Sequence, residues 1–120
     1  MANGDVVTDP RGSDVVLGDV GTSILFENEH VRVWEVLLEP GEVQEWHLHD
    51  HPYLVLAVEE ARNVMEYLDG SEPRSMHETV GRVVFRDAGK VHKLTNRGET
   101  TYRNRLIELK HLGREEEQDG

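Results

Sequence analysis

The chain has 120 residues, of which 24 are acidic, 13 are basic, seven are His and none is Cys. Such a chain forms one domain, with a core large enough that folding requires neither a disulfide nor a structural metal. The absence of Cys excludes disulfides, Cys-ligated zinc, iron–sulfur clusters and thiol nucleophiles, and the net charge of −11 argues against nucleic acid as a partner.

Residues 1–22 are expected to form an N-terminal arm. Gly and Pro interrupt them among Asp and Val, a mixture too punctuated for a helix and too polar for an isolated core strand. The arm could be frayed, or Val15–Leu17 could add a strand to a sheet or to a partner subunit. No segment resembles a signal peptide or approaches the roughly 18 apolar residues of a membrane span, so we expect a cytoplasmic protein without a membrane partner.

Residues 23–112 are expected to form an all-β barrel or sandwich. Short runs rich in Val, Leu, Ile and aromatic residues each end at Gly, Pro, Asn or Asp, which is typical of strands joined by turns. Only Glu59–Met65 could instead form a helical turn, and the charged residues 113–120 are expected to be a disordered acidic tail. The expected strands are His30–Glu39, Gln44–His49, Tyr53–Val58, Asn63–Leu68, Arg82–Arg86, Val91–Thr95 and Thr100–Lys110.

Three His alternate with other residues in the segment Trp46–His51. Residues i and i+2 of an extended strand point to the same face, so His47 and His49 are expected side by side, close enough to chelate one ion. A third donor must come from elsewhere, and His92, in a strand-like segment, is the obvious candidate. His51 shares the parity of the pair, but the Pro after it favours a bend. It could therefore be a further ligand, an outer hydrogen-bonding group or a proton shuttle.

The other three His have no partner at ligand spacing and are expected to be ordinary surface residues. They are His30, His77 and His111. For the pair His47 and His49, the alternative to a metal site is an exposed strand that binds stray metal without purpose. We favour a metal site, because placing two titratable rings on one face between apolar runs costs desolvation energy that coordination would offset.

Two segments resemble the sequence motifs of the cupin superfamily. The first reads Gly41-x5-His47-x-His49, and the second reads Gly81-x5-Asp87-x-Gly89-x2-His92-x3-Asn96. With the strand before them, they cover about Asn28 to Lys110. The resemblance implies a double-stranded β-helix, a small antiparallel barrel of the jelly-roll type. It also implies one divalent metal ion per chain, held inside by His47, His49 and His92.

The chain departs from the family pattern at two places. Asp87 stands where the second motif usually has Pro, a turn position that Asp can fill by capping its own backbone. Tyr53 and Leu54 stand where the first motif usually supplies a Glu ligand. Three neutral imidazoles would leave the ion its full +2 charge and open positions that attract anions. Fe(II) is favoured, and Zn, Ni, Mn or Cu would also fit.

Further candidate residues have weaker support. The hydroxyl of Tyr53 could hydrogen-bond a bound oxygen or move a proton, a catalytic task that His51 could share, or Tyr53 could be a barrel-wall aromatic residue. Arg103 and Arg105 lie on one parity of the last strand. If that parity faces inward, either would bind a carboxylate substrate; if it faces outward, both balance surface Glu residues.

The resemblance implies a metal-dependent enzyme acting on a small chelating or anionic molecule, with an Fe(II) dioxygenase-like activity favoured. The alternatives are an isomerase or lyase that uses the metal as a Lewis acid, and a non-catalytic barrel that binds a metal or metabolite. Strands at the rim of a small barrel are commonly covered by a second subunit, so we expect a homodimer.

Overall fold

The computed structural model describes residues 3–112, which form eleven strands and no helix, and hence no membrane-spanning helix. The expected acidic tail, residues 113–120, lies outside the described residues. The strands are β1 (Val6–Thr8), β2 (Asp14–Val16), β3 (Ser23–Glu27), β4 (Val31–Leu38), β5 (Val43–His47), β6 (Tyr53–Glu59), β7 (Ala61–Tyr67), β8 (Arg74–Glu78), β9 (Val83–Arg86), β10 (His92–Asn96) and β11 (Tyr102–Leu109).

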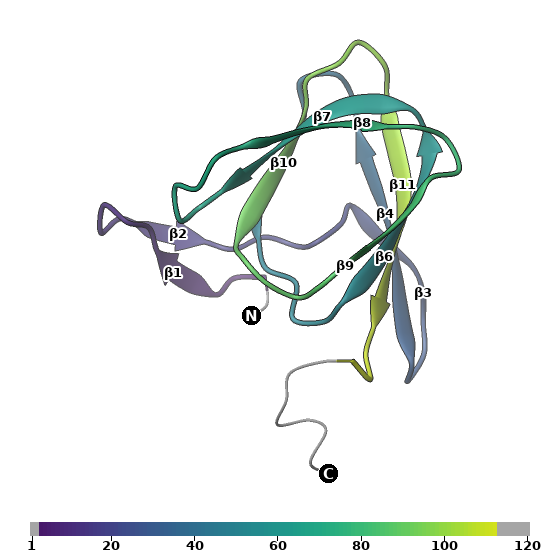
Figure 1. The fold of residues 1–120 in the computed structure, drawn as a ribbon. Coiled ribbons are helices and arrows are strands. Elements are labelled where there is room, and N and C mark those ends of the chain that lie inside the picture. Colours follow the sequence, from purple (N-terminus) through teal and green to yellow (C-terminus); the bar gives the residue numbers. More distant parts are fainter. Residues whose placement is uncertain (1–2, 113–120) are drawn as a thin grey trace.

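Two antiparallel sheets pack face to face as a jelly-roll barrel (Figure 1). One sheet has the order β5-β10-β7-β8 and the other has the order β3-β4-β11-β6-β9. The short strands β1 and β2 form a separate hairpin, seen at the left of Figure 1. The all-β fold expected from the sequence is therefore confirmed.

The alternation of residues along β4 and β11 builds the core between the sheets. In β11, Tyr102, Asn104 and Leu106 are buried while Arg103 and Arg105 between them face outward, and β4 pairs with β11 over its whole length. Trp34 and Val36 of β4 point inward beside them. Side chains of one parity fill the barrel because successive residues of a strand point to opposite faces of the sheet.

All seven expected strands occur, with ends shifted by up to two residues. The helical alternative for Glu59–Met65 is wrong, because Glu59 ends β6, Ala61 begins β7, and a single residue joins the two strands. Two strands of the barrel were not expected, β3 and β8. Both lie at sheet edges. All five residues of β3 are exposed, and β8 is polar except for one Met. Neither strand therefore shows the alternation of apolar and polar residues that predicts a half-buried strand.

The N-terminal arm is docked on the barrel through its last residues. Its strands pair with each other, and the backbone N–H of Gly18 donates to the carbonyl of Trp46 at 2.8 Å. Leu17 is buried. Gly21 packs so closely on Trp34 that an added Cβ would lie 2.7 Å from the Trp34 Cβ, so a side chain at this position would force the arm away from the barrel.

Asn96, at the end of β10, holds one corner of the barrel. Its side chain is fully buried, and its amide nitrogen donates to the backbone carbonyls of Leu38 (3.0 Å) and Thr100 (2.7 Å). Its side-chain oxygen accepts from the N–H of Gly98 at 3.0 Å, and its backbone carbonyl accepts from the N–H of Gly41 at 2.8 Å. One residue thus satisfies the polar groups of three chain segments where no water reaches them.

The two edges of the five-stranded sheet expose apolar side chains. Ile24, Leu25 and Phe26 of β3 and Val83 and Phe85 of β9 are each about half exposed. Exposed edge strands are the places where a second chain can pair. The homodimer expected from the sequence stays a prediction.

Candidate metal centre

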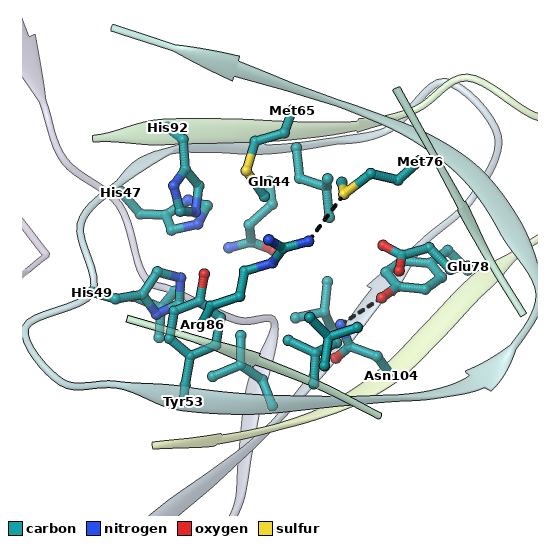
Figure 2. A pocket seen from close by; sticks show the side chains of 17 residues that line it. Gln44, His47, His49, Tyr53, Met65, Met76, Glu78, Arg86, His92 and Asn104 are labelled. Carbon is teal, nitrogen blue, oxygen red and sulfur yellow. Dashed lines mark hydrogen bonds between the residues drawn. The ribbon is translucent and has the colours of Figure 1, made fainter. Parts of the chain in front are cut away.

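Two strands and one loop bring three histidines together. His47 is the last residue of β5 and His92 the first of β10, and the antiparallel register places them directly opposite each other. His49 lies two residues beyond the end of β5, in the loop before β6. The ring centroids of His47 and His92 are 4.5 Å apart, and each lies 5.2 Å from that of His49. Figure 2 shows the three rings at one end of the cavity.

The cluster has the composition and spacing of a metal site. Each histidine offers one ligand nitrogen, and these nitrogens all lie within 4.8 Å of one another. The side chains are 3% (His47), 3% (His49) and 7% (His92) exposed. The predicted set of three is therefore brought together, although His49 reaches it from a loop and not from the same strand face as His47.

Hydrogen bonding prepares the ring of His47 for coordination. Its Nδ1 lies 2.6 Å from the backbone carbonyl of Glu45, which can only accept, so Nδ1 carries the proton and Nε2 keeps its lone pair. In His49, Nδ1 is buried and has no hydrogen-bond partner among residues 3–112. A buried polar atom without a partner is costly, and a bound ion is one group that removes the cost at such a cluster. The residues present fit a divalent cation.

Burial keeps all three imidazoles in the neutral form that binds metals. Desolvation lowers the pKa of His47, although the hydrogen bond to the carbonyl of Glu45 opposes this. Desolvation, with the charges of the other two rings, holds the pKa of His49 well below its usual value. Desolvation is also the main reason that the pKa of His92 falls to about 3. Protons therefore compete weakly for these nitrogens at neutral pH.

These shifts predict how the stability of the metal-free protein depends on pH. Below about pH 6.5 the unfolded chain binds protons at these histidines and the folded chain does not, so the free energy of unfolding falls as pH decreases toward 3. Between pH 6.5 and 5.5, we expect the free energy of unfolding of His92→Gln to fall by about 1 kcal/mol less than that of the wild type. Urea denaturation in the presence of a chelator measures this. An equal fall in His92→Gln and in the wild type would contradict the buried, neutral state of His92.

The histidines open into a small cavity of about 40 Å³ inside the barrel. The Tyr53 ring lies parallel to His49, with centroids 3.8 Å apart and an interplanar angle of 16°. Burial raises the pKa of Tyr53 to about 12, although the charge of Arg86 opposes the shift. Tyr53 therefore keeps its proton and can donate a hydrogen bond into the cavity, but it does not provide an anionic ligand.

The structure does not place His51 with the other predicted site residues. The chain bends at Asp50 and His51 before Pro52, so the strand parity that predicted a shared face no longer applies. His51 is half-buried and lines a separate surface depression, with Nδ1 lacking a hydrogen-bond partner among the described residues. The predicted proton shuttle has no contact with the cavity.

Arg103 and Arg105 also lie away from the cavity. The inward parity of β11 belongs to Tyr102 and Asn104, which line the cavity, and both arginines point to the outer face. There the two guanidinium groups share Glu35, at 2.7 Å from Arg103 and 3.0 Å from Arg105. The structure therefore gives the predicted substrate-binding role no support and favours the alternative of surface charge balance.

The histidines predicted to be ordinary surface residues are all exposed. His30 and His111 contact each other, with Nδ1 and Nε2 2.6 Å apart, and His77 pairs with Glu60. None of them lines the cavity. They therefore serve as controls for metal binding.

The sequence analysis missed the polar residues that line the rest of the cavity. They are Gln44, Glu78, Arg86 and Asn104, and all four are labelled in Figure 2. The segment Val83–Arg86 shows no alternation of apolar and polar residues, so no signal in the sequence indicated that Arg86 shares the inward parity of Val84. Glu78 likewise had no signal, because it ends the polar edge strand β8.

Solved structures with the same fold come from several organisms. A cupin domain from Bordetella pertussis is 22% identical, with a TM-score of 0.67, and the match covers 91% of this chain and 97% of that one. A cupin-like protein from Thermotoga maritima is 21% identical with a TM-score of 0.59, covering 77% and 70%. A cupin family protein with a double-stranded β-helix fold from Methanocaldococcus jannaschii is 14% identical with a TM-score of 0.60, covering 86% and 100%.

Sequence comparison adds no nearer relative. No protein-family model matches this sequence, and no curated protein matches it. At these identities the solved structures establish the architecture alone. The chain has the double-stranded β-helix fold of the cupins, with a three-histidine cluster suited to a metal ion inside the barrel.

Proposed function

We propose that this cupin-fold protein is a metal-dependent enzyme acting on a small chelating or anionic molecule, with an activity of the Fe(II) dioxygenase type. The observation that carries the proposal is the convergence of His47, His49 and His92, buried and neutral, at one end of a cavity. A divalent ion held there would supply open coordination positions for a chelating substrate and, as Fe(II), for dioxygen.

The chain's own residues would fix the ligands and keep the site dry. The carbonyl of Glu45 orients His47, and the stacked ring of Tyr53 restricts rotation of His49. Apolar side chains, including Met65 and Leu94, line the cavity beside them and limit the access of water. We assign proton donation to the Tyr53 hydroxyl alone, since His51 lies outside the cavity.

Metal analysis of protein purified without an affinity tag tests the proposal first. We expect about one divalent ion per chain, because one cluster of three ligands is present among the described residues. Protein that carries no divalent ion, and takes up none from added Fe(II) or Zn(II), would contradict the metal centre.

Oxygen uptake tests the reaction type. Fe(II)-loaded protein should consume oxygen when supplied with a panel of small chelating acids, whereas Zn(II)-loaded protein should not, because zinc has no accessible redox change. Conversion of an acid without oxygen uptake, by either form, would instead identify the metal as a Lewis acid and reject the dioxygenase activity.

A further inference from the structure

Arg86 projects into the same cavity that holds the histidines. It is the last residue of β9 and pairs across the sheet with Tyr53, so both side chains face the barrel interior. Its guanidinium group lies between the histidines and Glu78 in Figure 2. Arg86 also lines the outer hollow that His49 and His92 share with Lys90, and it is therefore reachable from the mouth of the cavity.

The guanidinium group of Arg86 has no carboxylate partner. Among residues 3–112 the other half-buried arginines, Arg32, Arg103 and Arg105, each pair with a Glu within 4.0 Å, whereas no such pair forms at Arg86. Its recorded hydrogen bond runs from Nη2 to the Met76 sulfur at 3.4 Å, and a thioether is a weak acceptor. Although the chain has 24 acidic residues, the N–H groups of Arg86 remain available to hydrogen-bond a ligand.

The opposite wall of the cavity carries acceptors. Glu78 is buried, accepts a hydrogen bond from the Asn63 amide at 3.3 Å, and lies more than 4.0 Å from Arg86, since no ion pair joins them. The side-chain oxygen of Asn104 is buried and has no hydrogen-bond partner among the described residues. One side of the cavity therefore attracts a carboxylate, and the other side repels it.

We propose that Arg86 binds the carboxylate of a small monocarboxylic acid beside the histidine cluster, and that Glu78 and Asn104 disfavour a second carboxylate at the far end. A guanidinium group binds a carboxylate through two parallel hydrogen bonds, a geometry that lysine cannot reproduce. This inference rests on the proposed function in that the same cavity takes the substrate, and it names the substrate class. Arg86 fills the role that the sequence analysis gave to Arg103 and Arg105.

Three four-carbon probes vary the number of carboxylates at nearly constant size. Butanoate carries one carboxylate, butanamide is its neutral counterpart, and succinate carries a second carboxylate. Binding of each to the full ¹⁵N-labelled chain is followed by NMR, metal-free and loaded with Zn(II), with the Arg86 Nε–H resonance as the local readout. In wild-type protein we expect butanoate to bind at least tenfold more tightly than butanamide or succinate.

Variants at Arg86 test the assignment directly. Arg86→Met should weaken butanoate binding at least tenfold, and Arg86→Lys should restore part of the affinity. Arg82→Met, which removes an exposed arginine just before β9, should leave the affinity unchanged. Glu78→Gln should raise the affinity for succinate relative to butanoate, because it removes the opposing charge. The ¹⁵N spectrum of each variant reports whether it is folded, and Arg86→Lys keeps the test open if Arg86→Met does not fold.

The outcomes separate this inference from the metal centre. Unchanged butanoate affinity in Arg86→Met and Arg86→Lys would overturn the role of Arg86, as would equal binding of butanamide, even if the protein holds a metal. Succinate binding as tightly as butanoate would overturn the selectivity. Arg86-dependent butanoate binding by protein that takes up no metal would support this inference while rejecting the proposed function.

Discussion

Each of the substitutions His47→Ala, His49→Ala and His92→Ala is expected to weaken binding of a divalent metal at least about 100-fold. Loss of a residue that merely hydrogen-bonds to a ligand typically weakens metal binding about 10- to 100-fold, so loss of the ligand itself should cost more. The remaining two histidines cannot compensate, because no other His, Asp or Glu among the described residues joins the cluster. Competition against a chromophoric chelator measures the change in affinity.

His77→Ala and His111→Ala are the matched controls, since both rings are exposed and neither lines the cavity. Their metal affinity should equal that of the wild type. A similar loss in all five variants would mean that metal binds loosely over the surface. Full retention in His92→Ala would mean that the pair His47 and His49 binds the ion without the opposite strand, and the three-ligand site would be wrong.

Asn96→Ala is expected to destabilise the barrel by about 3 kcal/mol, which corresponds to a fall of about 10 °C in Tm. The substitution removes three side-chain hydrogen bonds and leaves the carbonyl of Leu38 and the N–H of Gly98 to find other partners. Because Asn96 is fully buried, water cannot replace the lost amide without a rearrangement of the corner. Thermal and urea denaturation of the metal-free protein measure the loss.

Asn28→Ala controls for the loss of asparagine hydrogen bonds as such. The Asn28 side chain accepts from the backbone N–H groups of His30 (2.8 Å) and Val31 (2.9 Å), but it is exposed, so water can take its place. We expect a loss of about 1 kcal/mol or less. Equal losses in Asn28→Ala and Asn96→Ala would show that burial adds nothing and that the corner is not held in the way described.

Much of the fold could be predicted because most strands carry a local signal. The strands β4 and β11 alternate buried and outward residues, and turn residues mark where strands end. The strands β3 and β8 could not be predicted in this way, since an edge strand packs against one neighbour and its residues need not alternate. Their place in the sheet depends on long-range pairing, which no short window of sequence contains.

The site was predictable where spacing alone carries the chemistry. His47 and His92 belong to two motifs whose spacing resembles the cupin pattern, and the register of β5 and β10 then brings them opposite each other. The orientation of Arg103 and Arg105 was not predictable, because either parity of a strand can face the core until its neighbours are known. Arg86 was missed for a related reason: its importance comes from the absence of a carboxylate partner, which only three-dimensional contacts reveal.

The strand β5 lies at the edge of the four-stranded sheet, with β10 as its strand partner and the N-terminal arm bonded to Trp46. The pairing of β5 with β10 shifts register between His92 and Leu94. An ion bound by both His47 and His92 would link β5 to β10 beside this irregular pairing. Metal binding would then also stabilise the edge of the barrel. Without the ion, β5 would be held at this end by its backbone pairing with β10 and by the hydrogen bond from Gly18 to Trp46.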